Sequence, residues 1–261
     1  MTSTMDPTAL WGLEVLSLEE LLAVADLQTR RDRKYLVPQE EVDGLIAQSD
    51  TRVLAIGGSR VFRYESVYFD TDHLDSYLGA ARRRPRRFKV RTRSYLDSDQ
   101  CMVEVKTRDA RGRTVKHRHP HPVEHRGELT DTARRFVATI GLAAGHVDAL
   151  RPAMTTRYRR ATLLQEQPAS RVTVDFDVTW LDPEGLAADL TGFVLIETKT
   201  AGQPCPFDRI LWRAGHRPVT ISKYCTGLAA TDPGIPSNKW HRVLNRHFAA
   251  ATTNEPARPA R

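Results

Sequence analysis

The sequence predicts an α+β fold in which an eight-stranded antiparallel β-barrel has helices packed outside it. Charged residues occupy every second position in several segments, which is the period of a β-strand. The positions between them hold mainly Val, Ile, Leu, Phe and Thr. Segments with helix-capping signals lie between some of these strands. Closing an antiparallel sheet removes its edges and gives each strand an inner face, so this alternation favours a barrel with a charged interior.

The segment from Arg86 to Lys106 shows the alternation most clearly and predicts a β-hairpin. Its first strand carries three cations on one face, namely Lys89, Arg91 and Arg93, with Val90 and Thr92 on the other. The sequence Asp-Ser-Asp at 97–99 is typical of a turn. The returning strand places Met102, Glu104 and Lys106 on one face. A single solvated face would explain this hairpin alone, but the pattern recurs in other segments.

The first half of the chain begins with a predicted flexible arm over residues 1–16. Ser17 to Ala25 predicts a helix in which Ser17 is the N-cap and Glu20 completes a capping box. Asp70 and Thr71 are expected to cap a short helix. The remaining predicted elements are strands at 28–37 and 64–69 and a helix from Pro38 to about Gln48.

The second half predicts further strands and three helices, before a disordered tail at 251–261. Four histidines between His117 and His125 lie among two prolines, which predicts an exposed loop, and a metal site there is disfavoured. The predicted strands are 113–118, 153–164, 171–180 and 193–200, and the predicted helices are 129–142, 206–214 and 240–250. Residues 17–250 are therefore expected to form one domain.

The amino-acid composition of the chain favours an anionic partner. The 261 residues carry a net charge of +7, and the cations are mostly arginine, which suits an anionic partner. Three widely separated cysteines indicate neither a disulfide framework nor a zinc site, and a cytoplasmic location is expected. No apolar run approaches the length of a membrane span.

A barrel interior lined by so many cations requires a bound anion, because buried like charges repel and are costly to desolvate. A chain of phosphates fits this requirement, since arginine forks match phosphate oxygens and lysine adds point charges. The few carboxylates would hold Mg²⁺ or Mn²⁺ through oxygen ligands. Few aromatic residues lie among the basic positions, which argues against a nucleic-acid partner.

Nine segments, in order between about residues 28 and 228, carry a family resemblance. They are Arg30-x-Asp32-x-Lys34-Tyr35, Ser66–Thr71 (SVYFDT), Lys89–Arg93 (KVRTR), Val103–Thr107 (VEVKT), Lys116-x-Arg118, Tyr158-x-Arg160, Arg171–Asp175 (RVTVD), Ile196–Lys199 (IETK) and Ser222–Tyr224 (SKY). Together they resemble the VTC domain, the polyphosphate-polymerase domain of the vacuolar transporter chaperone complex, within the triphosphate tunnel metalloenzyme superfamily.

The resemblance implies an eight-stranded tunnel that binds a nucleoside triphosphate, with ATP as the expected donor, and transfers its terminal phosphate to a growing polyphosphate chain. It implies catalytic roles for Arg91, Arg93, Lys106, Arg160 and Lys199. It implies phosphate binding by Lys34, Lys89, Lys116, Arg118, Lys223, Tyr158 and Ser222. Glu197 is the leading ligand for Mg²⁺ or Mn²⁺, and Glu104 either joins it or holds a cation in place. The chain departs from the family at Asp32, where glutamate is expected.

Two alternatives to the polymerase remain open at this level. A hydrolase of tripolyphosphate or nucleoside triphosphates would use the same phosphate cradle with water as the acceptor. A non-catalytic module would bind polyphosphate without turnover, and the presence of Glu197 favours an enzyme over it. The membrane translocation of the eukaryotic complex does not carry over, because no lipid-binding or membrane segment is recognised. The oligomeric state and partner proteins are not predicted.

Overall fold

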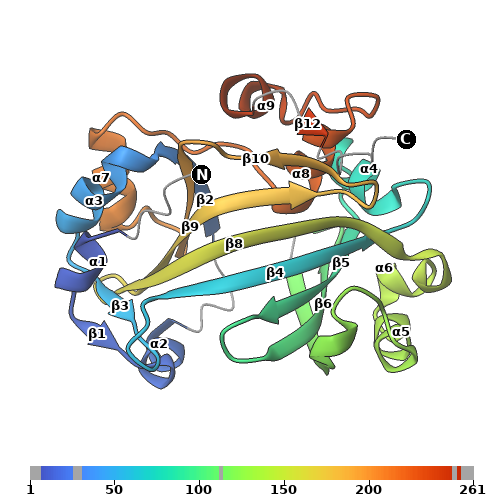
Figure 1. Cartoon of the computed structure of the whole chain (residues 1–261), viewed down its shortest axis with the longest axis horizontal. Coiled ribbons are helices and arrows are strands. Elements are labelled where there is room, and N and C mark those ends of the chain that lie inside the picture. The colour runs from blue at the N-terminus through green and yellow to red at the C-terminus, as the bar shows by residue number, and fades with distance from the viewer. Residues whose placement is uncertain (1–6, 26–30, 112–113, 249–251, 254–261) are drawn as a thin grey trace, which may run out of the picture. The chain divides into compact units, whose positions relative to one another are not determined.

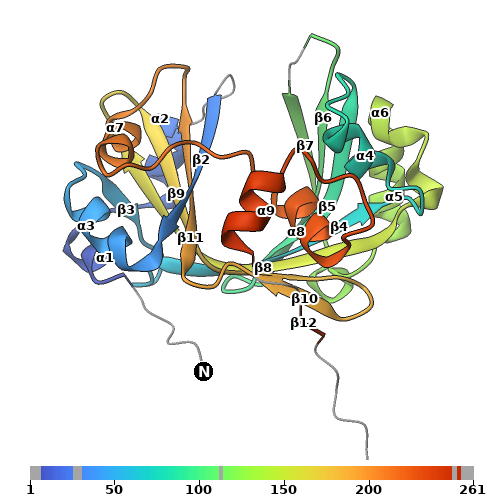
Figure 2. The same cartoon turned by 90° about the horizontal axis from the view of Figure 1, so that it is seen from above.

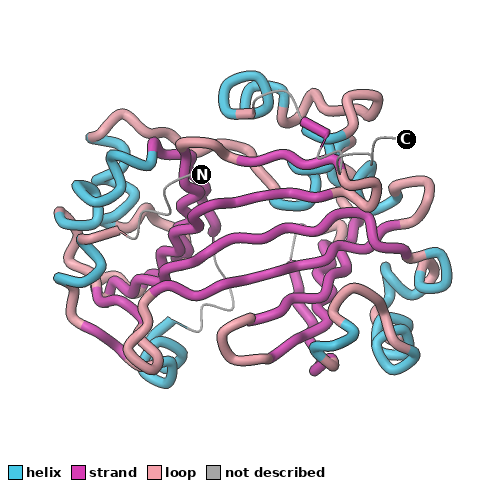
Figure 3. Tube along the Cα trace, viewed as in Figure 1, coloured by secondary structure: helices cyan, strands magenta, loops and turns pink. Residues whose placement is uncertain are grey.

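The computed structural model describes residues 7–25, 31–111, 114–248 and 252–253 and divides the chain into two compact units. Unit 1 comprises residues 1–62, 158–178 and 190–220, and unit 2 comprises residues 63–157, 179–189 and 221–261. Helices and long antiparallel strands occur together, as Figure 3 shows in cyan and magenta. The α+β class with a large antiparallel sheet is therefore confirmed.

Unit 1 contains short helices around a group of paired strands. Its helical segments are α1 (Ala9–Gly12), α2 (Leu18–Ala25), η1 (Gln39–Glu41), α3 (Val42–Ala47) and α7 (Pro206–Arg213). Its strands are β1 (Val15–Leu16), β2 (Arg31–Pro38), β3 (Arg52–Leu54), β11 (Phe193–Thr200) and parts of β4 (Val61–Asp70), β8 (Arg151–Gln165) and β9 (Ser170–Leu181). Strand β11 pairs antiparallel with both β2 and β9, whereas β1 pairs parallel with β3.

One face of the β2–β11–β9 sheet carries the main core of unit 1. Tyr35, Val174 and Ile196 from these strands pack with residues of α3 and α7, including Ile46 and Phe207. Helices α1, α3 and α7 gather beside this group of strands (Figure 1). Because strand side chains alternate, the even positions of β2 and the odd positions of β9 and β11 lie on the opposite face. That face holds Lys34, Asp175, Glu197 and Lys199.

Unit 2 contains a four-stranded meander in the order β4-β5-β6-β7, with each neighbouring pair antiparallel. Its further strands are β5 (Arg87–Tyr95), β6 (Gln100–Arg108), β7 (Thr114–His121), β10 (Leu186–Asp189) and β12 (Thr252–Thr253). Its helical segments are α4 (Asp75–Ala81), η2 (Val123–His125), α5 (Asp131–Ala138), α6 (Gly141–Ala144), η3 (Val147–Ala149), α8 (Lys223–Thr231) and α9 (His241–His247). Helices α4 and α8 are neighbours, as the view in Figure 2 shows.

The core of unit 2 lies between the meander and helices α5 and α6. Val90 of β5 and Val103 and Val105 of β6 are fully buried against Val137 of α5 and Ala143 of α6. Burial along β5 alternates strictly, with buried residues at even positions and half-buried cations at odd positions. The predicted two-faced hairpin is present, and its apolar face is covered by helices.

The predicted closed barrel is not formed among the described residues. Strand β2 pairs only with β11, and β7 pairs only with β6, so each has one unpaired edge in the described part of the chain. The edge strand β7 contains Pro120, which has no N–H to donate to a further strand. The charged side chains of Lys116 and Arg118 also discourage the addition of another strand.

Two predicted segments differ in the structure. The helix expected over 129–142 is divided into α5 and α6, because Thr139 Oγ1 donates to the carbonyl of Phe136 at 2.7 Å and Ile140 is extended. The loop expected at 117–125 is partly strand, since β7 continues to His121. His121 is buried, with Nε2 lying 3.0 Å from the carbonyl oxygen of His125.

The predicted ends of the chain lie partly outside the described residues. Residues 1–6 and 254–261 are not described, and Thr252–Thr253 forms β12. The segment 7–16, which the sequence predicts as a loose arm, contains α1 and β1, and Leu10 and Leu16 are buried. Within the described ranges, no helix has the length and apolarity needed to cross a membrane.

Candidate phosphate-binding faces

The charged face of the unit 2 meander places three lysines side by side. Lys89 of β5 is directly opposite Lys106 of β6, which in turn is directly opposite Lys116 of β7. Like charges at directly opposed positions destabilise a sheet. This lysine row, defined by these three residues, therefore favours an anion bound across the strands.

A second row, one pair further along the strands, contains a carboxylate between two arginines. Arg91, Glu104 and Arg118 are lateral neighbours on β5, β6 and β7. Arg91 Nε lies 2.8 Å from Glu104 Oε2, and Lys116 also forms an ion pair with Glu104. Arg93 lies on the same face of β5, opposite Met102. Glu104 thus holds Arg91 and Lys116 in place.

The pKa values in this cluster follow from burial and charge. Burial would raise the pKa of Glu104, but Arg91, Arg93 and Lys116 outweigh it and lower that pKa far below its usual value. The pKa of Lys116 falls to about 8, mainly because of burial, with Arg93 and Arg91 also lowering it against the opposing effect of Glu104. Glu104 is therefore ionised at neutral pH, and Lys116 stays largely protonated there but titrates near pH 8.

The N-terminus of α8 adds the predicted residues Ser222 and Lys223 to unit 2. Ser222 caps the helix by accepting from the backbone N–H of Cys225 at 3.2 Å. Lys89 Nζ donates to the same hydroxyl at 2.7 Å and lies 5.9 Å from the ring centre of Tyr224. Lys223 is the first residue of the helix, where the helix dipole also favours anions.

In unit 1, the charged face is organised around Glu197. Lys34 Nζ lies 3.0 Å from Glu197 Oε1, and Lys199 Nζ lies 3.4 Å from Glu197 Oε2. Lys199 also donates to Thr173 Oγ1 at 3.3 Å. The register explains this arrangement, because Lys34 and Thr173 are the lateral neighbours of Glu197 on β2 and β9.

These buried groups shift each other's pKa values. Burial would raise the pKa of Glu197, but Lys199, Lys34 and Arg160 lower it well below its usual value. The pKa of Lys199 falls to about 8 because burial lowers it, with a further contribution from Arg160, while Glu197 and Asp32 raise it. The pKa of Lys34 is raised, since Glu197 and Asp32 together outweigh burial.

Arg160 of β8 and Tyr158 complete the predicted set in unit 1. Arg160 makes a two-pronged contact with Asp175, from Nε to Oδ1 at 2.5 Å and from Nη2 to Oδ2 at 2.9 Å. The Arg160 guanidinium lies 5.1 Å from the ring centre of Tyr158. Asp175 therefore fixes the direction of the arginine, and two-pronged pairs of this kind are geometrically specific.

The five residues predicted as catalytic are divided between the two units. Arg91, Arg93 and Lys106 belong to unit 2, whereas Arg160 and Lys199 belong to unit 1. The expectation that all five face one lumen stays a prediction. Within each unit, the strand faces are as the alternation predicts.

The carboxylates of the two charged faces could hold a divalent cation only together with other ligands. Among the described residues there is no group of three His, Cys, Asp or Glu side chains arranged to hold a metal ion. Mg²⁺ in phosphate-transfer sites commonly uses one or two carboxylates together with substrate phosphates. Glu197 fits that mode, because it is ionised and shares its face with cations that are predicted to bind phosphate.

Three residues of unit 2 support the charged face, and the sequence had not assigned any of them to it. Tyr68 of β4 accepts from Arg91 Nη1 at 2.9 Å, and its ring stacks on Tyr224 with centres 5.2 Å apart. Tyr224 donates to Asp70 Oδ2 at 2.6 Å. The available signal was the alternation within β4, which places Tyr68 and Asp70 on one face.

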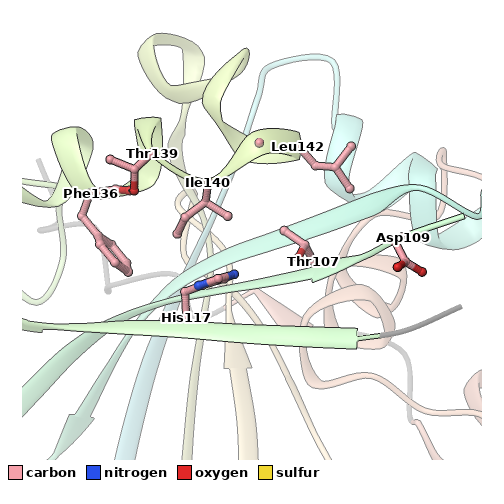
Figure 4. Close-up of a pocket in the computed structure, with 8 residues that line it drawn as sticks. Thr107, Asp109, His117, Phe136, Thr139, Ile140 and Leu142 are labelled. Atoms are coloured by element: carbon pink, nitrogen blue, oxygen red, sulfur yellow. The ribbon is translucent and has the colours of Figure 1, made fainter. Parts of the chain in front are cut away.

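A cavity of about 410 Å³ lies on the opposite side of the meander (Figure 4). Thr107 and His117 line it from β6 and β7, and Phe136 and Ile140 line it from the helical side. The odd positions of β6 and β7 face away from the lysine row. This cavity is therefore separate from the predicted phosphate-binding residues.

A family model described as the VTC domain matches residues 29–231. The chain belongs to the VTC domain family. The fourteen residues predicted for catalysis, phosphate binding and metal binding all lie within the matched segment. No curated protein matches this VTC domain.

Solved structures resemble the VTC domain only distantly. A candidate adenylate cyclase from Bacillus halodurans is 17% identical with a TM-score of 0.46, and the match covers 76% of this chain and 97% of that one. A candidate adenylyl cyclase from Hippeastrum, described as having a dominant triphosphatase activity, is 14% identical with a TM-score of 0.44, covering 75% and 93%. A protein from Pyrococcus horikoshii is 12% identical with a TM-score of 0.42, covering 75% and 93%.

Proposed function

We propose that this VTC domain is a polyphosphate polymerase that transfers the terminal phosphate of a nucleoside triphosphate, with ATP as the expected donor, to a growing polyphosphate chain. Family membership supports a phosphate-related activity. The observation that carries the proposal is the lysine row, in which Lys89, Lys106 and Lys116 are adjacent across three strands. Such a row is unfavourable without an anion and suits one with repeated charge.

Catalysis by this domain would depend on position and electrostatics, because phosphoryl transfer requires little covalent help from the protein. Arg91 and Arg93 would contact the oxygens of the transferred group with their planar forks. Glu104 keeps Arg91 oriented through the contact of 2.8 Å. A preorganised cation of this kind stabilises charge without rearranging during the reaction.

In unit 1, Glu197 and Asp175 have distinct roles. Glu197 would hold Mg²⁺ or Mn²⁺, and the bound ion would neutralise charge on the phosphate oxygens. Asp175 orients Arg160 through its two-pronged contact. Lys199 would gain a stable positive charge when phosphates bind, since its pKa of about 8 reflects burial that an anion offsets.

Transfer to phosphate is favoured over hydrolysis by the state of the carboxylates. A hydrolase orients its attacking water, commonly through a carboxylate that acts as a base. Glu104, Asp175 and Glu197 are each engaged by lysine or arginine. The low pKa values of Glu104 and Glu197 also make them weak bases.

The proposal is tested by incubating the purified chain with ATP and Mn²⁺ and separating the products on a gel. Long-chain polyphosphate is the expected product, and added short polyphosphate should shorten any lag. Release of orthophosphate alone, with or without this primer, would identify a triphosphatase. Binding of polyphosphate without turnover would identify the non-catalytic module.

A further inference from the structure

A turn rich in arginine connects α4 to β5 in unit 2. It contains four exposed arginines within five residues, which we call the arginine turn and define as Arg82, Arg83, Arg84 and Arg86. None of them is among the residues assigned above to phosphate binding or catalysis. The turn contains no acidic residue.

One arginine of the turn occupies a backbone position where glycine is preferred. Helix α4 ends with Arg84 N–H donating to the carbonyl of Gly79 at 2.9 Å and Arg83 N–H donating to that of Ala80 at 3.3 Å. This pair of bonds is the Schellman arrangement, whose left-handed position is usually glycine. Arg83 occupies that position with φ of 55°. A strained residue that persists at such a position points to a function for its side chain.

Arg87 links the arginine turn to the strand that carries the lysine row. Arg87, the first residue of β5, donates from Nη1 to the carbonyl of Arg84 at 2.7 Å. Arg87 is opposite Arg108 on β6, and the next pair on the same face is Lys89 with Lys106. The cationic face therefore continues from the lysine row to the turn.

Lys239 adds a further cation at the junction. Its Nζ donates to the carbonyl of Ala80, at the end of α4, at 2.7 Å. Burial lowers the pKa of Lys239, and the charges of Arg87, Lys89 and Arg83 lower it further against the opposing effect of Cys225. Arg83 of the turn and Lys89 of the lysine row therefore both lower the pKa of the same ammonium group, that of Lys239.

We propose that the arginine turn is a binding surface for the part of a polyphosphate chain that extends beyond the lysine row. Arginine forks bind successive phosphate oxygens without requiring a fixed register, which suits a uniform polymer. The inference rests on the proposed binding of phosphates at the strand face and adds a separate surface that acts only on long chains.

Inorganic polyphosphate is favoured over nucleic acid by the residues at the turn. Binding of single-stranded nucleic acid uses aromatic platforms beside the cations. The nearest aromatic residue in the sequence, Phe88, is buried against the α5–α6 side of the meander. The turn therefore offers charge and hydrogen-bond donors but no exposed ring.

The test compares wild type with a variant in which all four arginines of the turn are replaced by glutamine. Calorimetry measures the affinity of each protein for tripolyphosphate, for long-chain polyphosphate and for single-stranded DNA and RNA. We expect unchanged affinity for tripolyphosphate and a loss of about tenfold or more for the long chain. A control with the same change in charge replaces exposed arginines of α5, α7 and the loop after α7, namely Arg135, Arg209, Arg213 and Arg217. The control should retain wild-type affinity for both ligands.

The outcomes distinguish this inference from the proposed function. Wild type that does not bind tripolyphosphate would overturn the proposed function. Wild-type binding with no selective loss in the four-arginine variant would overturn the inference alone. A loss confined to single-stranded DNA or RNA would assign the turn to nucleic acid and also overturn the inference.

A single substitution provides a second, independent test. Arg83→Gly relieves the left-handed backbone position, so the temperature of thermal unfolding should rise. The same variant should bind long-chain polyphosphate more weakly than wild type. Higher stability with weaker binding would support the inference, whereas unchanged binding of the long chain would contradict it.

Discussion

The two charged faces of this VTC domain differ in how their charges are balanced. On the β2–β11–β9 face of unit 1, lysines and arginines share the surface with three carboxylates, namely Asp32, Asp175 and Glu197. On the β5–β6–β7 face of unit 2, eight cations share the surface with Glu104, and they are Arg87, Lys89, Arg91, Arg93, Lys106, Arg108, Lys116 and Arg118. The first face is close to neutral, and the second is strongly positive.

This difference predicts distinct roles for the two charged faces. A nearly balanced, buried cluster keeps its side chains in fixed positions and offers a carboxylate to a divalent cation. An unbalanced and more exposed face attracts an anion of high charge. We therefore expect changes in unit 1 to act mainly on turnover, and changes in unit 2 to act mainly on affinity.

The largest effect is expected for Glu197→Gln, which keeps the shape of the side chain and removes its charge. Turnover of ATP across a Mn²⁺ titration should fall by a factor on the order of 10²–10³, a typical loss for one group that stabilises transition-state charge. Affinity for tripolyphosphate without metal should be retained. The matched control is Asp177→Asn, also on β9, where the exposed Asp177 pairs with Arg159 at 2.6 Å. Wild-type turnover in Glu197→Gln would remove this residue from the metal site.

Removal of an arginine from unit 2 should weaken the binding of tripolyphosphate. Arg91→Ala and Arg93→Ala should each cost about 1.5–3 kcal/mol in tripolyphosphate affinity, measured by calorimetry, because each loses a charge-assisted hydrogen bond. That is roughly ten- to a hundred-fold. The loss should be greater for Arg91→Ala, since it also leaves Glu104 without the contact of 2.8 Å.

The control for these variants is Thr92→Ser on the opposite face of β5. Thr92 Oγ1 donates to the carbonyl of Arg126 at 2.5 Å, and serine retains that hydroxyl. Affinity for tripolyphosphate should not change. If Thr92→Ser weakened binding more than Arg93→Ala, the assignment of the strand faces would be reversed.

Affinity should also depend on pH in the range where lysines of both faces titrate. The pKa values of Lys199 and Lys116 are lowered from 10.5 to about 8, so both lose charge as pH rises through 8. Affinity for tripolyphosphate should fall by up to about tenfold per pH unit for each linked proton. Lys199→Arg should reduce this dependence, because arginine stays charged.

The lowered pKa values of these lysines affect the free energy of unfolding in the opposite direction to affinity. Between about pH 8 and 10.5, the folded chain has released protons from these lysines that the unfolded chain still binds. Their contribution to the free energy of unfolding therefore rises with pH in that window. Thermal unfolding of wild type and Lys199→Arg at several pH values measures it. An equal pH dependence in both proteins would exclude Lys199 as a source.

The smallest effect is expected from salt. Between about 0.1 and 1 M salt the Debye length falls from about 10 to 3 Å. Binding of polyphosphate should weaken a few-fold because the unit 2 face is accessible to ions. The temperature of unfolding should change little, since the pairs around Glu197 are largely buried. A large loss of stability with unchanged binding would contradict the contrast between the faces.

Much of the local structure could be predicted from the sequence. The alternation in 86–106 correctly separated the cations of β5 from its buried residues, because period two is a property of the strand itself. The strand at 193–200 and the capping box of Ser17 and Glu20 are also present. In each case the determining interactions lie within a few residues along the chain.

The tertiary structure decided which residues meet. The sequence placed Lys89, Lys106 and Lys116 on charged faces, but only the register of three strands makes them adjacent. The hydrogen bond from Arg91 to Tyr68 joins two strands, and the hydrogen bond from Tyr224 to Asp70 joins a helix to a strand. A shift of one residue in register would turn each set to the other face. Residue type and period therefore determined the charge of each face, whereas pairing between distant segments determined the sites, because register depends on turns and packing across the whole unit.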